Sequence, residues 1–195
     1  MTTQPAARPA ASDRRRVSAE VGELARSSDP AARMLLARRR DLPSRIRDAL
    51  AADADAKVAK SVATDPGLSD GALRAMVDRH GSRVAAKVAA NPAAAPALLE
   101  ELTWYGNTAR KVLREVARHP RASVPALLVC LADQDARRVV AGHPALPLPV
   151  LLDLLDDADP QVVEAAAGNP SLPFAVMADL LNGRSAGSGS PLTHS

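Results

Sequence analysis

The chain has 195 residues and a formal net charge of +3, and it contains one Phe, one Tyr and one Trp. This composition excludes a core built on aromatic bulk, so thin layers of small aliphatic side chains must bury the apolar surface. The single cysteine, Cys130, excludes an intrachain disulfide and a four-thiolate metal site. It lies in the apolar run ALLVCL, which favours a buried, inert thiol over a reactive one.

Ala, Leu and Arg are strong helix formers, and β-branched and aromatic residues other than Val are scarce. The composition therefore predicts an all-α fold. No apolar run reaches the roughly 18 residues of a membrane-spanning helix, and the N-terminus lacks the hydrophobic region of a signal peptide. We expect a cytoplasmic protein without a membrane partner, and the bias toward Ala, Arg, Pro, Asp and Val suggests a bacterial source rich in GC.

In chain order, residues 1–16 are predicted to form a disordered basic tail. Residues 17–28 are predicted to form a capping helix that has Val17, Val21 and Leu24 on one face. A repeat domain is predicted over 17–182, with the capping helix as its first element. The Gly- and Ser-rich segment 183–195 is predicted to be a second disordered tail.

The repeat is marked by a proline that follows Asp, Asn or His. These pairs recur at spacings of 26, 28, 24 and 26 residues, at Asp65-Pro66, Asn91-Pro92, His119-Pro120, His143-Pro144 and Asn169-Pro170. Val or Ala stands four and eight residues before each proline, as one buried helical stripe requires. An earlier copy over 31–40 keeps the same phase, with Arg40 in place of the proline. The chain therefore contains about six copies of a unit of about 26 residues.

Each unit has a second half that begins near a proline and is rich in leucine, as in ALLEEL, ALLVCLA and VLLDLLD. Proline is tolerated in the first turn of a helix, so each repeat is predicted to be a pair of short helices, the second α or 3₁₀. Aspartates are predicted to cap the first helices, at Asp29, Asp55, Asp133 and Asp159. One such pair cannot bury its own apolar face, so we expect the pairs to stack into an α-solenoid.

The phrase VAxNP…LLxxLxxDxDxxV, best seen over 88–102 and 140–170, resembles the leucine-rich repeat variant family. The resemblance covers about residues 29–182. It implies alternating α and 3₁₀ helices in a right-handed superhelix, related to HEAT repeats. The founding type of the family carries a cysteine cluster for an iron–sulfur centre before its repeats. This chain has no cysteine before Cys130, so that cofactor is not implied here.

Catalytic and metal-binding motifs are weak. His119 and His143 occupy the repeat position that Asp65, Asn91 and Asn169 fill elsewhere, so a shared polar capping role is a better interpretation than a metal site. The acidic pairs lack the glycine and the distal glutamate of a calcium loop. The sequence has no GxSxG motif and no glycine-rich phosphate loop. We therefore expect neither catalysis nor a cofactor.

Trp104 and Tyr105 lie where one repeat is two residues longer than its neighbours. Two of the three aromatic residues in such an insertion make a candidate recognition feature. The alternative, slightly favoured, is that both rings fill a packing gap in the irregular repeat.

Basic residues recur in register. The first column lies just before the first valine position of the repeat and contains Lys57, Arg83 and Lys111. The second column lies two places after that position and contains Lys60, Arg114 and Arg138. Stacking predicts that these six residues form a binding ridge. The ridge would face an acidic protein or a phosphate backbone, unless the cations merely solvate a helix face.

The sequence thus predicts a non-enzymatic scaffold for protein–protein interaction, with an acidic surface on the partner. The alternative is nucleic-acid binding through the Lys and Arg columns of the N-terminal two-thirds of the chain. Residues 1–120 carry 21 basic and 14 acidic side chains, a net of +7, and residues 121–195 carry 4 and 8, a net of −4.

Overall fold

The computed structural model describes residues 19–39 and 41–178, and every regular element in those residues is helical. The prediction of an all-α protein is confirmed. The chain divides into two compact units, unit 1 in residues 1–95 and unit 2 in residues 96–195. The predicted tails and Val17 lie outside the described residues. The single repeat domain over 17–182 stays a prediction.

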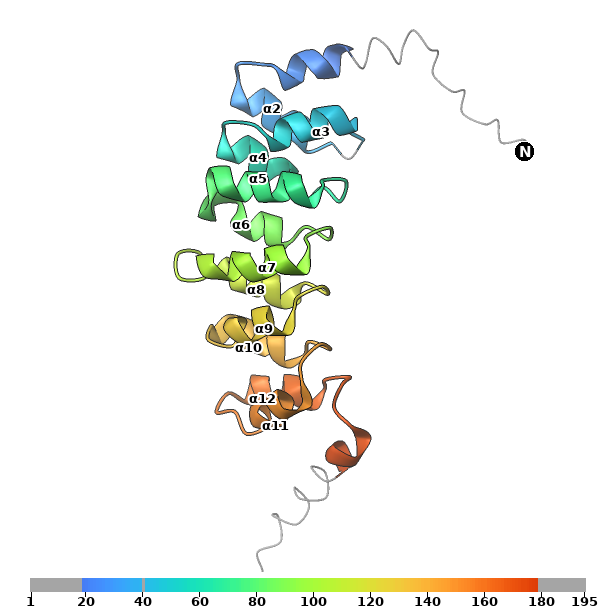
Figure 1. Ribbon diagram of the computed structural model, residues 1–195, viewed down its shortest axis with the longest axis vertical. Coiled ribbons are helices and arrows are strands. Elements are labelled where there is room, and N and C mark those ends of the chain that lie inside the picture. The colour runs from blue at the N-terminus through green and yellow to red at the C-terminus, as the bar shows by residue number, and fades with distance from the viewer. Residues whose placement is uncertain (1–18, 40, 179–195) are drawn as a thin grey trace, which may run out of the picture. The chain divides into compact units, whose positions relative to one another are not determined.

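Unit 1 contains a helix over residues 19–25, followed by α2 (Pro30–Ala37), α3 (Ser44–Ala51), α4 (Ala56–Val62), α5 (Asp70–His80) and α6 (Ser82–Ala89). α2 packs against α4 and α4 against α6, while α3 packs against α5 (Figure 1). α3 also contacts α4, and α5 contacts α6. Two rows of helices therefore enclose the core of this unit.

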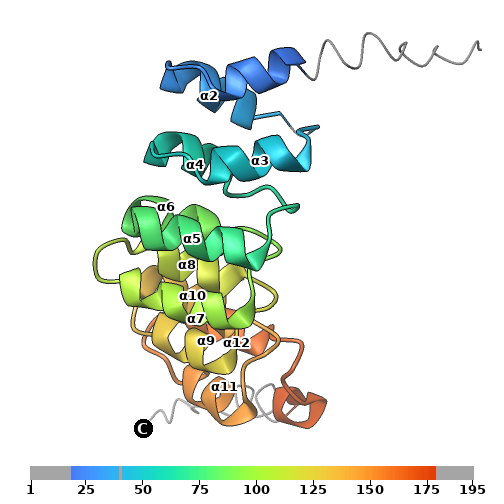
Figure 2. The ribbon, with the colours of Figure 1, turned by 45° about the horizontal axis from the view of Figure 1, so that its top comes forward.

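Unit 2 contains α7 (Pro96–Leu102), the 3₁₀ helix η1 (Thr103–Tyr105), α8 (Lys111–Arg118), α9 (Val124–Cys130), α10 (Gln134–Ala141), α11 (Leu148–Leu154) and α12 (Pro160–Ala167). α8, α10 and α12 pack in sequence, and α7, α9 and α11 contact the helices of that row (Figure 2). The same alternation of first and second helices is found in both units.

The predicted valine stripe forms the core of each unit. In the five copies that carry the proline, its ten positions are at most 1% exposed, at Val58, Val62, Val84, Val88, Val112, Val116, Ala136, Val140, Val162 and Ala166. The leucines of the second helices lie opposite, with Leu99, Leu127 and Leu151 fully buried. Thin aliphatic layers thus replace aromatic bulk, as the composition requires.

The second helices α3, α5, α7, α9 and α11 are all α-helical. The alternation with 3₁₀ helices that the family resemblance implies is therefore not found there, and η1 is the 3₁₀ helix among the described elements. The physical reason is the spacing of the leucines. In α7, Leu98, Leu99 and Leu102 are buried together, which matches the 3.6-residue period of an α-helix and not the three-residue period of a 3₁₀ helix.

The four predicted aspartate caps are confirmed, because the side chains of Asp29, Asp55, Asp133 and Asp159 each accept a hydrogen bond from a first-turn N–H. The other two first helices have no side-chain cap. Gly81 alone joins α5 to α6, and its φ of 56° lies in the left-handed region that favours glycine.

The Asn and His residues before the repeat prolines connect neighbouring repeats within each unit. In unit 1 the Asn91 amide donates to the carbonyls of Ala63 and Asp65 over 2.7 and 2.9 Å, and its oxygen accepts from Ala93 N–H over 2.8 Å. In unit 2 Asn169 makes the corresponding three bonds. A cap was expected; the additional bonds hold the repeats in register.

His143 also connects two neighbouring repeats, through its imidazole ring. Its Nδ1 accepts from Ala145 N–H over 3.1 Å, so the ring proton lies on Nε2, which donates to the carbonyl of His119 over 3.1 Å. The shared polar role is therefore the correct interpretation of this histidine. Within the described residues, no group of three or more His, Cys, Asp or Glu side chains is placed to hold a metal ion.

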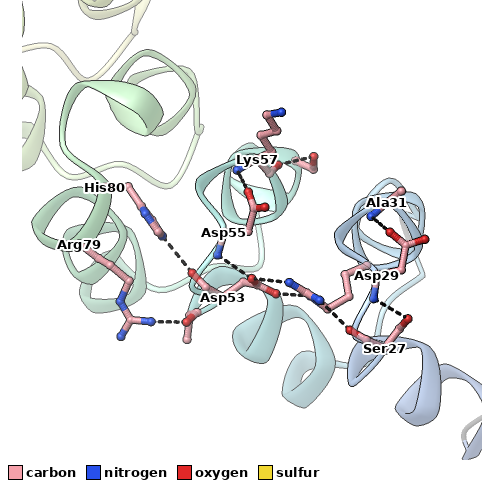
Figure 3. Close-up of polar contacts among 11 residues, drawn as sticks. Ser27, Asp29, Ala31, Asp53, Asp55, Lys57, Arg79 and His80 are labelled. Carbon is pink, nitrogen blue, oxygen red and sulfur yellow. Dashed lines mark hydrogen bonds and ion pairs between the residues drawn. The ribbon is translucent and has the colours of Figure 1, made fainter.

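A polar cluster ties three segments of unit 1 together (Figure 3). Arg33 on α2 donates to both carboxylate oxygens of Asp53, over 2.7 and 3.1 Å, and Asp53 lies between α3 and α4. His80 at the end of α5 bonds to the Asp53 carbonyl over 3.0 Å. Burial opposes ionisation of Asp53, but the bonds from Arg33 and from Asp55 N–H outweigh it and lower the pKa of this carboxyl from 3.8.

Asp53 is predicted to make unit 1 sensitive to acid. Because its pKa is lower in the folded chain, its stabilising effect is present above the unfolded value and is lost as the pH falls through the folded value. Asp53→Asn should lower the melting temperature at pH 7, and the difference from the wild type should shrink below about pH 4. Thermal melts followed by circular dichroism from pH 2.5 to 7 check this, and a constant difference would contradict it.

Candidate functional site

α4 carries a polar face that is rich in lysine. Four polar residues recur at i, i+3, i+4 and i+7, so they lie on one side of α4 and of the turn that follows it. They are Lys57, Lys60, Ser61 and Thr64. Val58, Ala59 and Val62 lie on the other side and are buried. The helix starts where Asp55 accepts from Lys57 N–H over 2.7 Å, which fixes the phase of both faces.

The neighbouring helices complete a groove over this face, which we call the lysine groove. α2 contributes Met34, and Arg38 follows at its C-cap; α6 contributes Lys87 from its last turn. The groove has a volume of about 330 Å³ and is lined by Met34, Arg38, Lys57, Lys60, Ser61, Thr64 and Lys87. It therefore combines four cations and two hydroxyls from three helices that pack side by side.

The lysine groove is electrostatically unbalanced. Its four cations are exposed, and none forms an ion pair with another described residue. Among its lining residues, all in the described part of unit 1, none carries a carboxylate. The chain has only four lysines, and three of them are here. Such a surface attracts anions, to which it offers charged N–H donors and two hydroxyl groups.

A second hollow, of about 560 Å³, lies beyond Arg38, Ser61 and Thr64, which line both hollows. Two of its three charged lining residues are paired. Arg39 donates to Asp41 over 2.7 Å, and Asp65 lies 3.6 Å from Arg47. The third, Arg38, is the unpaired cation that this hollow shares with the lysine groove.

The six residues of the predicted ridge do not share one environment. Lys57 and Lys60 line the lysine groove, while Arg83 is exposed on α6, one turn before Lys87, and does not line it. Lys111 is exposed on α8 in unit 2. The sequence columns missed Lys87, which occupies a different repeat position; its spacing of four residues from Arg83 on one helix was the available signal.

The two remaining ridge residues are neutralised within unit 2. Arg114 lies 3.5 Å from Asp135, and Arg138 donates to Asp159 over 2.9 Å. The N–H of Gln161, together with Arg138, lowers the pKa of Asp159 from 3.8. Two of the six cations of the predicted ridge are therefore paired, because the following repeat supplies an aspartate to each arginine. The binding role of the ridge stays a prediction.

The aromatic insertion places Trp104 on the surface, where it is 81% exposed. The packing interpretation is therefore wrong for this ring. Tyr105 is half-buried, and its carbonyl accepts from Thr108 and Ala109 N–H. Gly106 packs closely against Leu113, because a Cβ at this position would lie 2.8 Å from that side chain. A recognition role for Trp104 and Tyr105 stays a prediction.

Unit 2 also exposes aliphatic side chains. Leu128 on α9 and Leu152 on α11 are 44% and 41% exposed at equivalent positions of consecutive second helices. The corresponding positions of α3 and α5 carry Asp48 and Arg74. α9 and α11 thus differ from α3 and α5 in the chemistry that they present at this position.

Cys130 is fully buried, and its thiol donates to the carbonyl of Leu113 over 3.4 Å. Burial, with a smaller contribution from Asp133, raises the pKa of the thiol to about 12. We expect no reaction with iodoacetamide at pH 8 in the folded protein and complete reaction in 6 M guanidinium, because only the thiolate attacks. Mass spectrometry of the two samples checks this; rapid alkylation of the folded chain would contradict it.

Comparisons with protein-family models, with curated proteins and with solved structures give no match for this chain. No helix in the described ranges has both the length and the apolar character needed to cross a bilayer. The fold and the site therefore have to be interpreted from their own geometry.

Proposed function

We propose that this chain is a non-enzymatic binding protein, built as a solenoid of about six repeats, whose lysine groove holds an anionic macromolecule. The observation that supports this most is the gathering of four unpaired cations in one groove that carries no carboxylate. Acidic proteins and nucleic acids both belong to the proposed class of partner. The resemblance to the leucine-rich repeat variant family is part of this proposal, because repeats of that kind supply extended binding surfaces.

The contrast between the units supports a binding role. In unit 2 the arginines of the second column are paired with aspartates, whereas Lys60, from the same column, has no such partner in the described chain. Clustered like charges repel one another and favour an oppositely charged partner. If these cations only solvated a helix face, they would be expected to be scattered rather than to converge from α2, α4 and α6.

The proposal is tested with two labelled polyanions, a 20-residue poly-L-glutamate and the single-stranded oligonucleotide dT20. Fluorescence anisotropy at 50 mM NaCl should detect binding of at least one of them to the full chain. Substitution of Lys57, Lys60 and Lys87 by Gln should weaken that binding. If neither probe binds, or if the variant binds as tightly as the wild type, the proposed function is wrong.

A further inference from the structure

We infer that the partner of the lysine groove is a nucleic acid, held by its phosphodiester backbone without recognition of the bases. This inference rests on the proposed function and narrows it to one class of macromolecule.

The donors of the groove suit phosphate oxygens. Three ammonium groups, one guanidinium and the hydroxyls of Ser61 and Thr64 are of the types that make most backbone contacts in protein–nucleic acid complexes. The planar fork of arginine binds two oxygens of a carboxylate or of a phosphate, whereas lysine binds either anion as a point charge. The chain contains 21 arginines and 4 lysines, yet the groove contains three lysines and one arginine. The cations of the groove are therefore suited to point-charge contacts, which phosphate oxygens accept.

The groove lacks the apolar centre of a protein–protein interface. Such interfaces place aromatic or aliphatic anchors in a dry centre and move charges to the rim. Here four of the seven lining residues are cations, and Met34 is the one residue with a wholly apolar character among them. Burying these cations under a protein would cost desolvation free energy at every charge that was not paired well. A phosphate backbone stays hydrated and gains affinity by releasing counterions, so it needs no dry centre.

The cations also follow the direction in which the helices of unit 1 succeed one another. Arg38 follows α2, Lys57 and Lys60 lie on α4, and Lys87 lies on α6. Helices in contact are about 8–10 Å apart, so three helices extend the charge over roughly 20 Å. This length accommodates several successive phosphates of one strand, at about 3.4 Å of duplex rise for each. A linear polyanion matches this arrangement better than a compact acidic patch.

The groove lacks the side chains that stack on bases or that read adenine. The lining residues, all described, include no aromatic ring for stacking and no Asn or Gln for a bidentate contact to adenine. Binding should therefore tolerate changes of sequence. Four phosphate contacts predict a slope of log K against log salt of about −3 for a single strand, or about a 50-fold loss of affinity between 50 and 200 mM NaCl.

The test compares dT20, a mixed-sequence single strand, a mixed-sequence duplex and a single-stranded RNA, all of 20 units, with 20-residue poly-L-glutamate. Anisotropy titrations of the full chain are run from 50 to 200 mM NaCl. At least one nucleic acid should bind about tenfold or more tightly than poly-L-glutamate, with a slope near −3 for a single strand. Single strands of different sequence should agree within about threefold.

Four results would overturn the inference. If poly-L-glutamate binds as tightly as every nucleic acid, the inference fails and the proposed function stands. If no probe binds, both fail. A slope near zero, or a preference above about tenfold for one base sequence, shows that phosphates do not carry the binding. The Lys57→Arg, Lys60→Arg, Lys87→Arg variant separates charge from folding, because it should keep the slope near −3.

Discussion

Replacing Lys57, Lys60 and Lys87 by Gln is expected to weaken the binding of dT20 by about 100-fold or more at 50 mM NaCl. Each lost phosphate contact removes a counterion-release contribution of nearly tenfold at this salt concentration. The slope of log K against log salt should fall from about −3 to about −1, because only Arg38 remains in the groove. All three lysines are exposed, so the variant should fold like the wild type.

A matched control removes the same charge elsewhere. Arg26, Arg45 and Arg110 are exposed, form no ion pair with another described residue and do not line the lysine groove. Their triple substitution by Gln lowers the net charge by the same three units. It should weaken dT20 binding by less than about fivefold if position decides affinity. Equal losses in the two variants would mean that net charge alone attracts the oligonucleotide.

Asn91→Ala is expected to have the largest effect on stability of any polar substitution in unit 1, about 2–4 kcal/mol. The side chain is fully buried. Its removal takes a hydrogen-bond donor from the carbonyls of Ala63 and Asp65 and an acceptor from Ala93 N–H. Buried polar groups that lose their partners cost about 1–3 kcal/mol each, although carbonyls with a second partner cost less. Urea denaturation followed by circular dichroism measures the change.

His143 occupies in unit 2 the repeat position that Asn91 occupies in unit 1, so its substitutions provide a comparison for Asn91→Ala. His143→Asn should cost less than about 1 kcal/mol, because asparagine makes the corresponding bonds at Asn91 and Asn169. His143→Ala should cost about 1–3 kcal/mol, since it leaves the His119 carbonyl and Ala145 N–H without this partner. If the Asn and Ala variants lose stability equally, the hydrogen bonds between repeats are not what this position contributes.

The core and the helix starts were predictable because they depend on short-range spacing. Val58 and Val62 lie four residues apart and ahead of a proline, and this pattern alone places them on one buried face. Asp55 was recognisable as a cap because its carboxylate only has to reach the N–H two residues later. The bonds of Asn91 to the previous repeat span 26 and 28 residues, and no local pattern indicates them.

Whether a cation of the basic columns forms an ion pair depends on a longer spacing. Arg114 and Arg138 are each followed 21 residues later by the aspartate that pairs with them, Asp135 and Asp159. Lys60 is followed 21 residues later by Gly81, which has no side chain to pair with it. This difference is present in the sequence. It can be interpreted only once the structure shows that residues 21 positions apart in the sequence are neighbours in successive repeats.

The groove itself was not predictable from the columns. Columns compare equivalent positions of each repeat, whereas a groove between helices collects residues from different positions. Lys87 occupies the repeat position of Ser61, and Arg38 follows the end of α2, so neither belongs to the column of Lys57 or of Lys60. Their convergence depends on how α2, α4 and α6 pack, which the spacing of valines alone does not give.

The most direct test is a lysine footprint, because the chain carries only four lysines and three line the groove. The full chain is acetylated with an N-hydroxysuccinimide ester, with and without saturating dT20, and each lysine is followed by mass spectrometry. Lys57, Lys60 and Lys87 should react at least about fivefold more slowly in the complex, because contacts to phosphate shield the ammonium groups. Lys111 should keep its rate. Unchanged rates at the three groove lysines in a chain that has bound dT20 would contradict the assignment of the lysine groove as the binding surface.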